Sequence, residues 1–157
     1  MQAHDLTEDT VMLEIRKASP ENLQDATKLF NLYRVFYKQD DNLKEAEKFI
    51  EDRLTQQDSV IYLAFLSGTP VGFMQLYPIF SSVSMKKLWL LNDLYVKVPA
   101  RKNGIGKELL NKAKQLAMDT RAKGLILETE ESNKPAQKLY QREGFIRNQN
   151  QFYCYDL

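Results

Sequence analysis

The sequence predicts a single α/β domain, residues 1–157, built on a mixed sheet. Apolar, β-rich segments at 60–66 and 71–77 are joined by a Ser-Gly-Thr-Pro turn, which is typical of an antiparallel hairpin. Further along, a strand at 88–98, a helix and a strand at 125–130 form a β-α-β unit. Its right-handed crossover makes those two strands parallel, so the sheet holds both kinds of pairing.

The first part of the chain reads as one strand followed by two helices. Residues 11–17 form the strand, and Ser19 and Pro20 then supply a helix N-cap and a proline at the first helical position. Apolar residues recur at helical spacing from there to Tyr37. A second helix begins near Asn42, and its predicted inward face is Leu43, Ala46, Ile50 and Leu54.

The second part contains the β-α-β unit and a smaller helix. Residues 78–87 form a looser segment before the strand at 88–98, and the following helix at 104–122 has Gly124 as its expected C-terminal cap. After the strand at 125–130, a helix at 133–143 ends at Gly144. Residues 145–147 and 151–155 are expected to form a closing hairpin, which completes the order β-α-α-β-β-β-α-β-α-β-β.

The composition favours a soluble, cytoplasmic protein. Lys and Arg number 22 against 21 Asp and Glu, so the net charge of +1 suggests neither a nucleic acid nor a membrane as partner. The apolar run at 60–66 is far shorter than the roughly 20 residues of a membrane helix. The single cysteine, Cys154, fits a reducing compartment. Residues 1–10 are polar and acidic, unlike a signal peptide, and we expect them to be flexible.

The most informative segment is Arg101-Lys102-Asn103-Gly104-Ile105-Gly106, between a strand and a helix. Its glycines let backbone N–H groups approach a ligand, and the helix start adds positive charge, which suits a phosphate or pyrophosphate. A dinucleotide fingerprint requires a glycine where Leu109 stands, and a Walker loop requires Ser or Thr at Glu108. The pattern Arg-x-x-Gly-x-Gly after an aliphatic strand end fits at every position.

With a second block, this loop resembles the GCN5-related N-acetyltransferase (GNAT) superfamily. The first block is Leu91-Asn92-Asp93-Leu94-Tyr95-Val96 with Arg101-x-x-Gly104-x-Gly106, and the second is Asn133-x-x-Ala136-x-x-Leu139-Tyr140-x-x-x-Gly144-Phe145. Both blocks lie on the elements, and at the separation, typical of the family. The resemblance implies a small single-domain GNAT member with the acyl-CoA N-acyltransferase fold, an N-acetyltransferase that uses acetyl-CoA as co-substrate.

The resemblance also implies which residues bind acetyl-CoA, because the family binds it where two parallel strands splay apart. The backbone of Leu94, Tyr95 and Val96 would pair with the pantetheine amides. Asn133 would contact the pantetheine arm, Ala136 and Gln137 would line the cofactor, and Tyr140 would lie near its sulfur. The loop would hold the pyrophosphate through Arg101, Lys102, Asn103, Gly104, Ile105, Gly106 and Lys107.

Tyr140 is the predicted catalytic acid. A phenol near the sulfur can protonate the leaving thiolate, and such help is typically worth about 10²–10⁴ in rate. The alternative is a packed core tyrosine, since Leu139 and Phe145 beside it are apolar. A backbone N–H freed by a bulge near Leu94–Val96 would stabilise the thioester oxygen, as the resemblance implies.

The general base remains open at the sequence level. Some relatives place a glutamate where this chain has Asn92, and for Asp93 a structural role competes with a catalytic one. The candidates are Asp93, Glu128 and Glu130, with water relays as a further option. His4 is expected to have no chemical role, and Cys154 is expected to pack in the core or at an edge, with no histidine near it in sequence. We therefore expect direct attack in a ternary complex, without a covalent acyl-enzyme and without a metal.

The acceptor is predicted only as a class. The motifs are most similar to small GNAT members that acetylate polyamines, amino acids or basic protein tails, which favours a small cationic amine or a lysine side chain. Tyr37 and Tyr77 are candidate acceptor-binding residues, although most aromatic residues at such spacing pack in the core. Because family members commonly dimerise, we expect a homodimer. The alternative function is a non-catalytic module that binds acetyl-CoA or CoA and regulates a partner.

Overall fold

A computed structural model describes residues 11–157, which form two compact units. The first unit ends at Leu127 and the second comprises Glu128–Leu157. Residues 1–10, which include His4 and were predicted to be flexible, lie outside the described residues. Within the part of the chain that is described, no helix has the length and apolar character needed to cross a bilayer.

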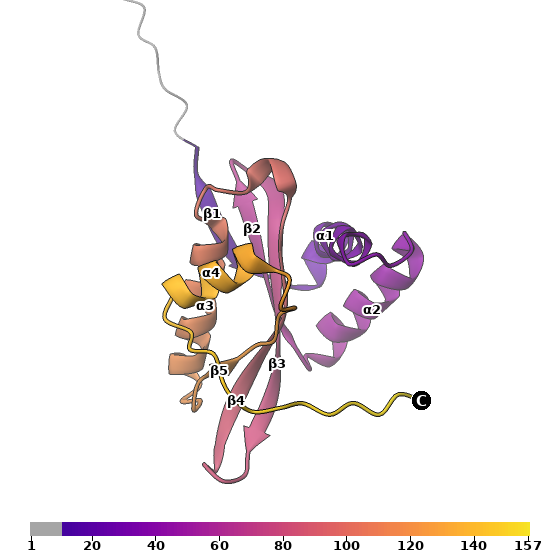
Figure 1. Ribbon diagram of the computed structural model, residues 1–157. Helices are drawn as coiled ribbons and strands as arrows, with labels where there is room; N and C mark the ends of the chain where they lie inside the picture. Colours follow the sequence, from indigo (N-terminus) through magenta and orange to yellow (C-terminus); the bar gives the residue numbers. More distant parts are fainter. Residues whose placement is uncertain (1–10) are drawn as a thin grey trace, which may run out of the picture. The chain divides into compact units, whose positions relative to one another are not determined.

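The first unit is a five-stranded mixed sheet in the order β1-β2-β3-β4-β5. Neighbouring strands from β1 to β4 are antiparallel, whereas β4 and β5 are parallel, as the sequence predicted. Helices α1 and α2 lie on one face of the sheet and α3 lies on the other (Figure 1). The elements are β1 (Leu13–Lys17), α1 (Leu23–Phe36), α2 (Leu43–Gln56), β2 (Val60–Leu66), β3 (Thr69–Ser81), β4 (Lys86–Val96), α3 (Ile105–Asp119) and β5 (Leu125–Ile126). Short 3-10 turns, η1 (Pro20–Asn22) and η2 (Val98–Ala100), precede α1 and follow β4.

Capping groups determine where the helices of this unit begin and end. The side chain of Asn42 accepts a hydrogen bond from the Glu45 N–H at 3.2 Å, and α2 begins at the next residue. At the end of α3, the Thr120 hydroxyl donates to the Leu116 carbonyl at 2.7 Å. Gly124 was predicted as this C-terminal cap, and that prediction is wrong. The Gly124 carbonyl instead accepts from the N–H of Trp89 at 3.1 Å, at the start of the parallel pairing.

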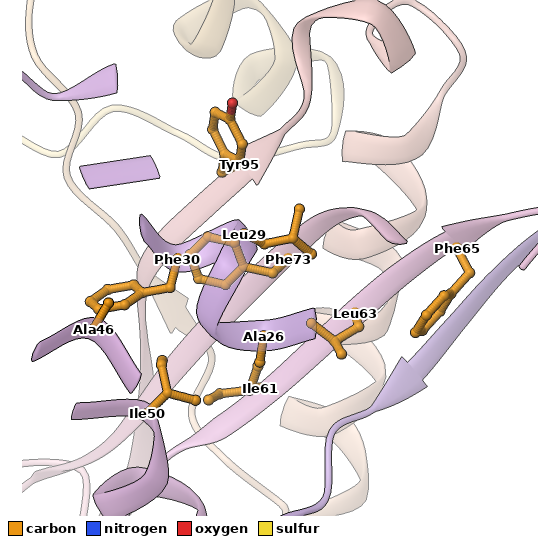
Figure 2. Packing of buried hydrophobic residues seen from close by; sticks show 10 residues of the cluster. All are labelled: Ala26, Leu29, Phe30, Ala46, Ile50, Ile61, Leu63, Phe65, Phe73 and Tyr95. Carbon is orange, nitrogen blue, oxygen red and sulfur yellow. The ribbon is translucent and has the colours of Figure 1, made fainter. Parts of the chain in front are cut away.

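The core beneath α1 and α2 joins both helices to the sheet (Figure 2). Leu29 and Ile50 from the helices and Leu63 and Phe73 from the strands are fully buried. Burying such a side chain stabilises the fold by about 1.5–3 kcal/mol. Leu43, predicted to point inward, is 47% exposed, because it is the first residue of α2 and has no preceding turn of that helix beside it.

Strands β3 and β4 form a longer hairpin than the sequence indicated. The pairing continues through Pro78↔Trp89 to Ser81↔Lys86, so most of the segment at 78–87, predicted to be loose, is strand. Proline lacks an N–H and normally interrupts a central strand. Pro78 is tolerated because β2 pairs with β3 only as far as Val60↔Leu76, which leaves that edge of β3 free beyond Leu76.

The second unit contains α4 (Lys134–Arg142). The Asn133 side chain caps it by accepting from the Ala136 N–H at 3.3 Å, and Gly144, at a φ of 90°, follows its end. Residues 145–157 contain no strand, so the predicted closing hairpin is wrong. Aromatic residues favour strands only through cross-strand partners, which local composition does not supply. Cys154 is exposed rather than packed in the core or at an edge.

Candidate active site

A β-bulge in β4 decides which face of the sheet its polar residues occupy. Gln75 pairs with Asp93, but the next residue, Leu76, pairs with Leu91, so Asn92 is the extra residue. Residues directly opposite in a pair share a face, and successive residues alternate. Asp93 therefore shares the face of Gln75, while Leu91 lies on the opposite face.

The two faces of β4 contact different helices. On one, the Trp89 indole N–H donates to the Thr120 hydroxyl next to α3 at 2.9 Å. On the other, the side chains of Asp93 and Tyr95 contact Tyr33 of α1. The bulge thus places the side chains of Asp93 and Tyr95, in the second half of β4, on the face that meets α1.

A bulge was predicted near Leu94–Val96, and the structure places it at Asn92, two residues before Leu94. Leu94, Tyr95 and Val96 themselves pair regularly with residues 74, 73 and 72 of β3. Gly72 allows the close pairing here, because a Cβ at that position would lie 2.9 Å from the Tyr95 carbonyl oxygen.

The other edge of β4 is paired with β5 over a very short stretch. Only Trp89 and Leu90 have partners, Leu125 and Ile126, although the sequence predicted a strand through residue 130. The predicted cofactor-binding residues Leu94, Tyr95 and Val96 lie beyond this pairing. An unpaired strand edge can receive an extended, amide-containing ligand through β-type hydrogen bonds.

The loop between η2 and α3 presents backbone N–H groups at the start of the helix. Lys102 and Gly104 adopt left-handed φ values of 66° and 74°, and the Asn103 side chain donates to the Ala100 carbonyl at 2.9 Å. The N–H groups of the first turn of any helix have no intrahelical acceptor, and no side chain caps them at the start of α3. An open hollow beside the loop is lined by Leu13, Glu14, Ile15, Asn103, Gly104, Lys107, Glu108 and Lys112. These features suit an anion at the start of α3.

Arg101, predicted to contact the pyrophosphate, directs its side chain back toward the sheet. Its Nε donates to the Val96 carbonyl at 2.8 Å, and its guanidinium lies 5.1 Å from the ring centre of Phe36 and 5.7 Å from that of Tyr95. Arg101 therefore connects the end of β4 with the end of α1. Arg101 is itself exposed, as are the other two cations of the loop region, Lys102 and Lys107.

Asp93 is a buried carboxylate with several hydrogen bonds, and it is only 5% exposed. Gln75 Nε2 donates to its Oδ2 at 2.9 Å, Asn92 Nδ2 donates to its Oδ1 at 3.2 Å, and Tyr33 supplies a third side-chain hydrogen bond. Burial raises the pKa of Asp93, and these three hydrogen bonds oppose that rise. A carboxylate whose pKa is raised toward neutrality is a stronger base than an exposed one.

The two predicted acceptor-binding tyrosines lie on the α1 side of the sheet. Burial, followed by the nearby charge of Asp93, raises the pKa of Tyr77 to about 12. Tyr77 is therefore protonated at neutral pH, and it shares a hydrogen bond with Gln75. Tyr37 is 38% exposed, and its ring centre lies 4.9 Å from that of Tyr33.

Sequence reasoning missed Gln75, and it did not predict the contact between Tyr33 and Asp93. Tyr33 contacts Asp93, Tyr37 and Tyr95, and so connects three residues that the sequence did single out. The signal for Gln75 is visible in the sequence as an amide in the middle of an otherwise apolar strand. Such a residue requires a polar partner when it is buried.

The second unit carries the other predicted residues on and before α4. Gln137 Nε2 donates to the carbonyls of Glu130 and Glu131 at 3.0 and 2.9 Å. Together with the cap at Asn133, these bonds fix the turn that leads into α4. Ala136 is partly buried on this helix, as is Tyr140, whose ring centre lies 5.9 Å from that of Phe145. Glu128 and Glu130, the other candidate bases, are exposed. Across residues 11–157, no three His, Cys, Asp or Glu side chains gather as they would around a metal ion.

The chain matches a known family over most of its length. The Acetyltransferase (GNAT) family matches residues 26–145, a stretch that includes both motif blocks. The protein belongs to this family. The predicted resemblance, the GNAT fold class and the enzyme class are thereby confirmed, and the protein is an N-acetyltransferase.

Individual relatives agree with the family assignment. The acetyltransferase is 45% identical over 133 residues to an uncharacterized N-acetyltransferase, YhfO, of Bacillus subtilis (strain 168), covering 85% of this chain and 89% of the relative. A solved structure described as a probable acetyltransferase is 41% identical, with a TM-score of 0.84 and coverage of 92% and 96%. An aminoglycoside acetyltransferase from an uncultured soil metagenomic sample, in complex with sisomicin, has a TM-score of 0.82 at 19% identity, over 92% of this chain and 96% of that one. The last likeness concerns the fold alone.

Proposed function

We propose that this acetyltransferase moves the acetyl group of acetyl-CoA to a primary amine, by direct attack in a ternary complex. The acceptor is proposed to be a small cationic amine, such as a polyamine or amino acid, or a lysine side chain. The observation that carries the proposal is the continuous path from the unpaired edge of β4, through the glycine loop, to the first turn of α3. Acetyl-CoA supplies the activated acetyl thioester when it is bound.

The residues along this path fit acetyl-CoA as the acetyl donor. Extended pantetheine amides require backbone partners, and the edge of β4 at Leu94–Val96 lies beyond the pairing with β5. A pyrophosphate requires N–H donors and positive charge, which the first turn of α3, Lys102 and Lys107 provide. Asn133, Ala136 and Gln137 are proposed to line the same donor, because they stand in the second family motif.

Asp93 is the base we propose for the acceptor. An alkylammonium group has a pKa near ~10 and must lose a proton before its nitrogen attacks the thioester carbonyl. The buried Asp93 carboxylate has a raised pKa and lies on the face of β4 that meets α1. It accepts that proton directly or through a water molecule.

The leaving group and the carbonyl oxygen also need partners. As the nitrogen bonds to the carbonyl carbon, the carbon–sulfur bond breaks, and the Tyr140 phenol donates a proton to the thiolate sulfur. The nitrogen loses its second proton to water as the amide forms, and the Tyr140 phenolate regains a proton from water. The support for Tyr140 is its place in the family motif. A backbone N–H at the Asn92 bulge, outside the regular β3–β4 pairing, is proposed to stabilise the negative oxygen.

The proposed cationic acceptor is supported by the surroundings of Asp93. Tyr77 lies close enough for the Asp93 charge to raise its pKa, so a carboxylate and an aromatic ring are neighbours there. The rings of Phe36 and Tyr95 already hold the guanidinium of Arg101. Tyr37 adjoins this aromatic group through Phe36, at 5.3 Å between ring centres. Aromatic faces and a carboxylate together favour a cation.

Assembly and location form a further part of the proposal. We propose a cytoplasmic homodimer, for which the single cysteine and the exposed side chains of Phe152, Tyr153 and Tyr155 are the support. Light scattering after size exclusion tests the dimer, and a monomer at micromolar concentration contradicts it.

The central experiment is a thiol-release assay over polyamines, amino acids and lysine peptides, with CoA binding measured separately by calorimetry. Amine-dependent release of CoA thiol, together with the acetylated amine by mass spectrometry, supports the proposal. Tight CoA binding with no turnover on any amine would point instead to a binding module.

A further inference from the structure

Gln75 is a fully buried amide in a strand whose other inward residues are apolar, and its two ends bind different groups. We propose that Gln75, restrained by a hydrogen bond from Ser59, is a positioning residue that aims the Asp93 carboxylate for proton transfer. This inference rests on the proposed role of Asp93 as the base.

The geometry is a chain of two hydrogen bonds. The Ser59 hydroxyl donates to Gln75 Oε1 at 2.9 Å, and Gln75 Nε2 donates to Asp93 Oδ2, also at 2.9 Å. An ionised carboxylate only accepts, so the NH₂ group of Gln75 must face Asp93. The amide oxygen then faces Ser59, whose hydroxyl donates to it.

The opposite orientation of this amide is unfavourable at Asp93. It would place Oε1 against the negative Asp93 oxygen, whereas the Ser59 hydroxyl can bond to either end of the amide. Asp93 therefore selects the orientation, and the hydrogen bond from Ser59 helps to hold the amide in it. A hydrogen bond to an ionised oxygen is also stronger than a neutral one, so Gln75 restrains the carboxylate more firmly than a neutral pair would.

The backbone explains why Gln75 reaches Asp93. The two residues are directly opposite in the β3–β4 pairing, immediately before the register shift at Asn92. If Asn92 were paired regularly with Gln75 instead, Asp93 would lie on the face turned toward α3, away from Gln75. The bulge and the amide thus determine the direction of the carboxylate together.

Few other groups act on the Asp93 carboxylate. Among residues 11–157, the titratable side chains near it on this face are Tyr33 of α1, Tyr77 of β3 and Tyr95 of β4 itself. From α2 and the turn after it, Arg53 and Asp58 form an ion pair at 2.9 Å and act on Tyr77. Helix α3 lies on the opposite face, and β5 contributes only Leu125 and Ile126. Among these partners, Gln75 also receives a hydrogen bond from a second side chain, the Ser59 hydroxyl.

The test combines a direct titration of Asp93 with a pH profile of the reaction. In the full-length protein, the ¹³C signal of the Asp93 carboxyl, assigned with Asp93→Asn, is followed against pH for the wild type, Gln75→Leu and Ser59→Ala. The acidic limb of kcat/KM against pH is measured for the same proteins.

Gln75→Leu removes a hydrogen bond to the ionised form, so we expect the pKa of Asp93 and the acidic limb of kcat/KM to rise together, by about one pH unit. Ser59→Ala should shift both in the same direction by a smaller amount, whereas Ser59→Thr, which keeps the hydroxyl, should behave as the wild type. Thr27→Val is the control for a buried polar change elsewhere in the core, because the Thr27 hydroxyl has no hydrogen-bond partner among the described residues.

The outcomes separate the two ideas. An unchanged Asp93 titration in Gln75→Leu, or an equal shift in Thr27→Val, overturns the positioning role. A shifted titration with an unchanged kcat/KM profile overturns Asp93 as the base while the link from Gln75 to Asp93 stands. If Gln75→Leu does not fold, the Ser59→Ala and Ser59→Thr pair decides the question alone.

Discussion

Gly72 lies so close to Tyr95 across the β3–β4 pairing that a Cβ at position 72 would stand 2.9 Å from the Tyr95 carbonyl oxygen. Backbone atoms cannot move aside as the end of a flexible side chain can. Close pairing of the two strands at this point therefore depends on glycine. This close pairing holds in place the part of β4 that is proposed to bind the pantetheine arm.

Gly72→Ala should push β4 away from β3 and lower the free energy of unfolding by about 1–3 kcal/mol, as overpacking typically does. Urea denaturation measures the loss. Gly124→Ala is the matched control, since a Cβ there meets nothing within 4 Å, and it should leave stability almost unchanged. Equal stability of the two variants would show that the strands separate without cost.

Tyr140→Phe should reduce kcat by an order of magnitude or more, because it removes the proposed proton donor to the thiolate. The ring, and with it the contact to Phe145, is retained. CoA affinity by calorimetry should therefore stay close to that of the wild type. Turnover equal to the wild type would remove Tyr140 from the mechanism.

Gly106→Val should weaken CoA binding by about tenfold or more, since a β-branched side chain would cover the N–H groups of the first turn of α3 proposed to bind the pyrophosphate. Isothermal calorimetry with CoA measures the change. A substitution on the exposed surface later in the same helix, Asn111→Val, should leave CoA affinity unaltered. Unaltered affinity in Gly106→Val itself would contradict the loop assignment.

Asp93 should make stability fall as pH rises. Burial raises its pKa above the ordinary value of 3.8, so between that value and the raised one the folded protein binds more protons than the unfolded chain. Stability decreases with pH wherever the folded state holds the extra proton. The free energy of unfolding of the wild type, relative to Asp93→Asn, should therefore decline from about pH 4 upward. Urea titrations at several pH values measure this difference in the free energy of unfolding. A difference that rises with pH over this range would contradict the prediction.

Local chemistry allowed much of the fold to be predicted from the sequence. Asn42 and Asn133 begin helices because each side chain accepts a hydrogen bond from an N–H three residues later. The glycine loop before α3 was recognisable because its backbone conformations are favoured by glycine, as at Gly104. The parallel pairing of β4 and β5 followed from the handedness of the crossover between them.

Other features depend on pairing between distant residues, and these were predicted less well. Residues 145–157 have strand-like composition but form no strand, because composition does not provide a partner. The β3–β4 hairpin is longer than expected, since Pro78 lies beyond the reach of β2. The bulge arises two residues earlier than the predicted segment, because register is a property of two strands together.

The sequence by itself determined the family, the positions of the helices and the loop before α3, since each depends on residues that are close in the chain. The tertiary structure alone decided that Asn92 is the extra residue of β4 and that Asp93 therefore turns toward α1. It also decided that Ser59 and Gln75, which are 16 residues apart in the chain, form one hydrogen-bonded chain with Asp93. Long-range strand register places these side chains together, and no local propensity encodes that register.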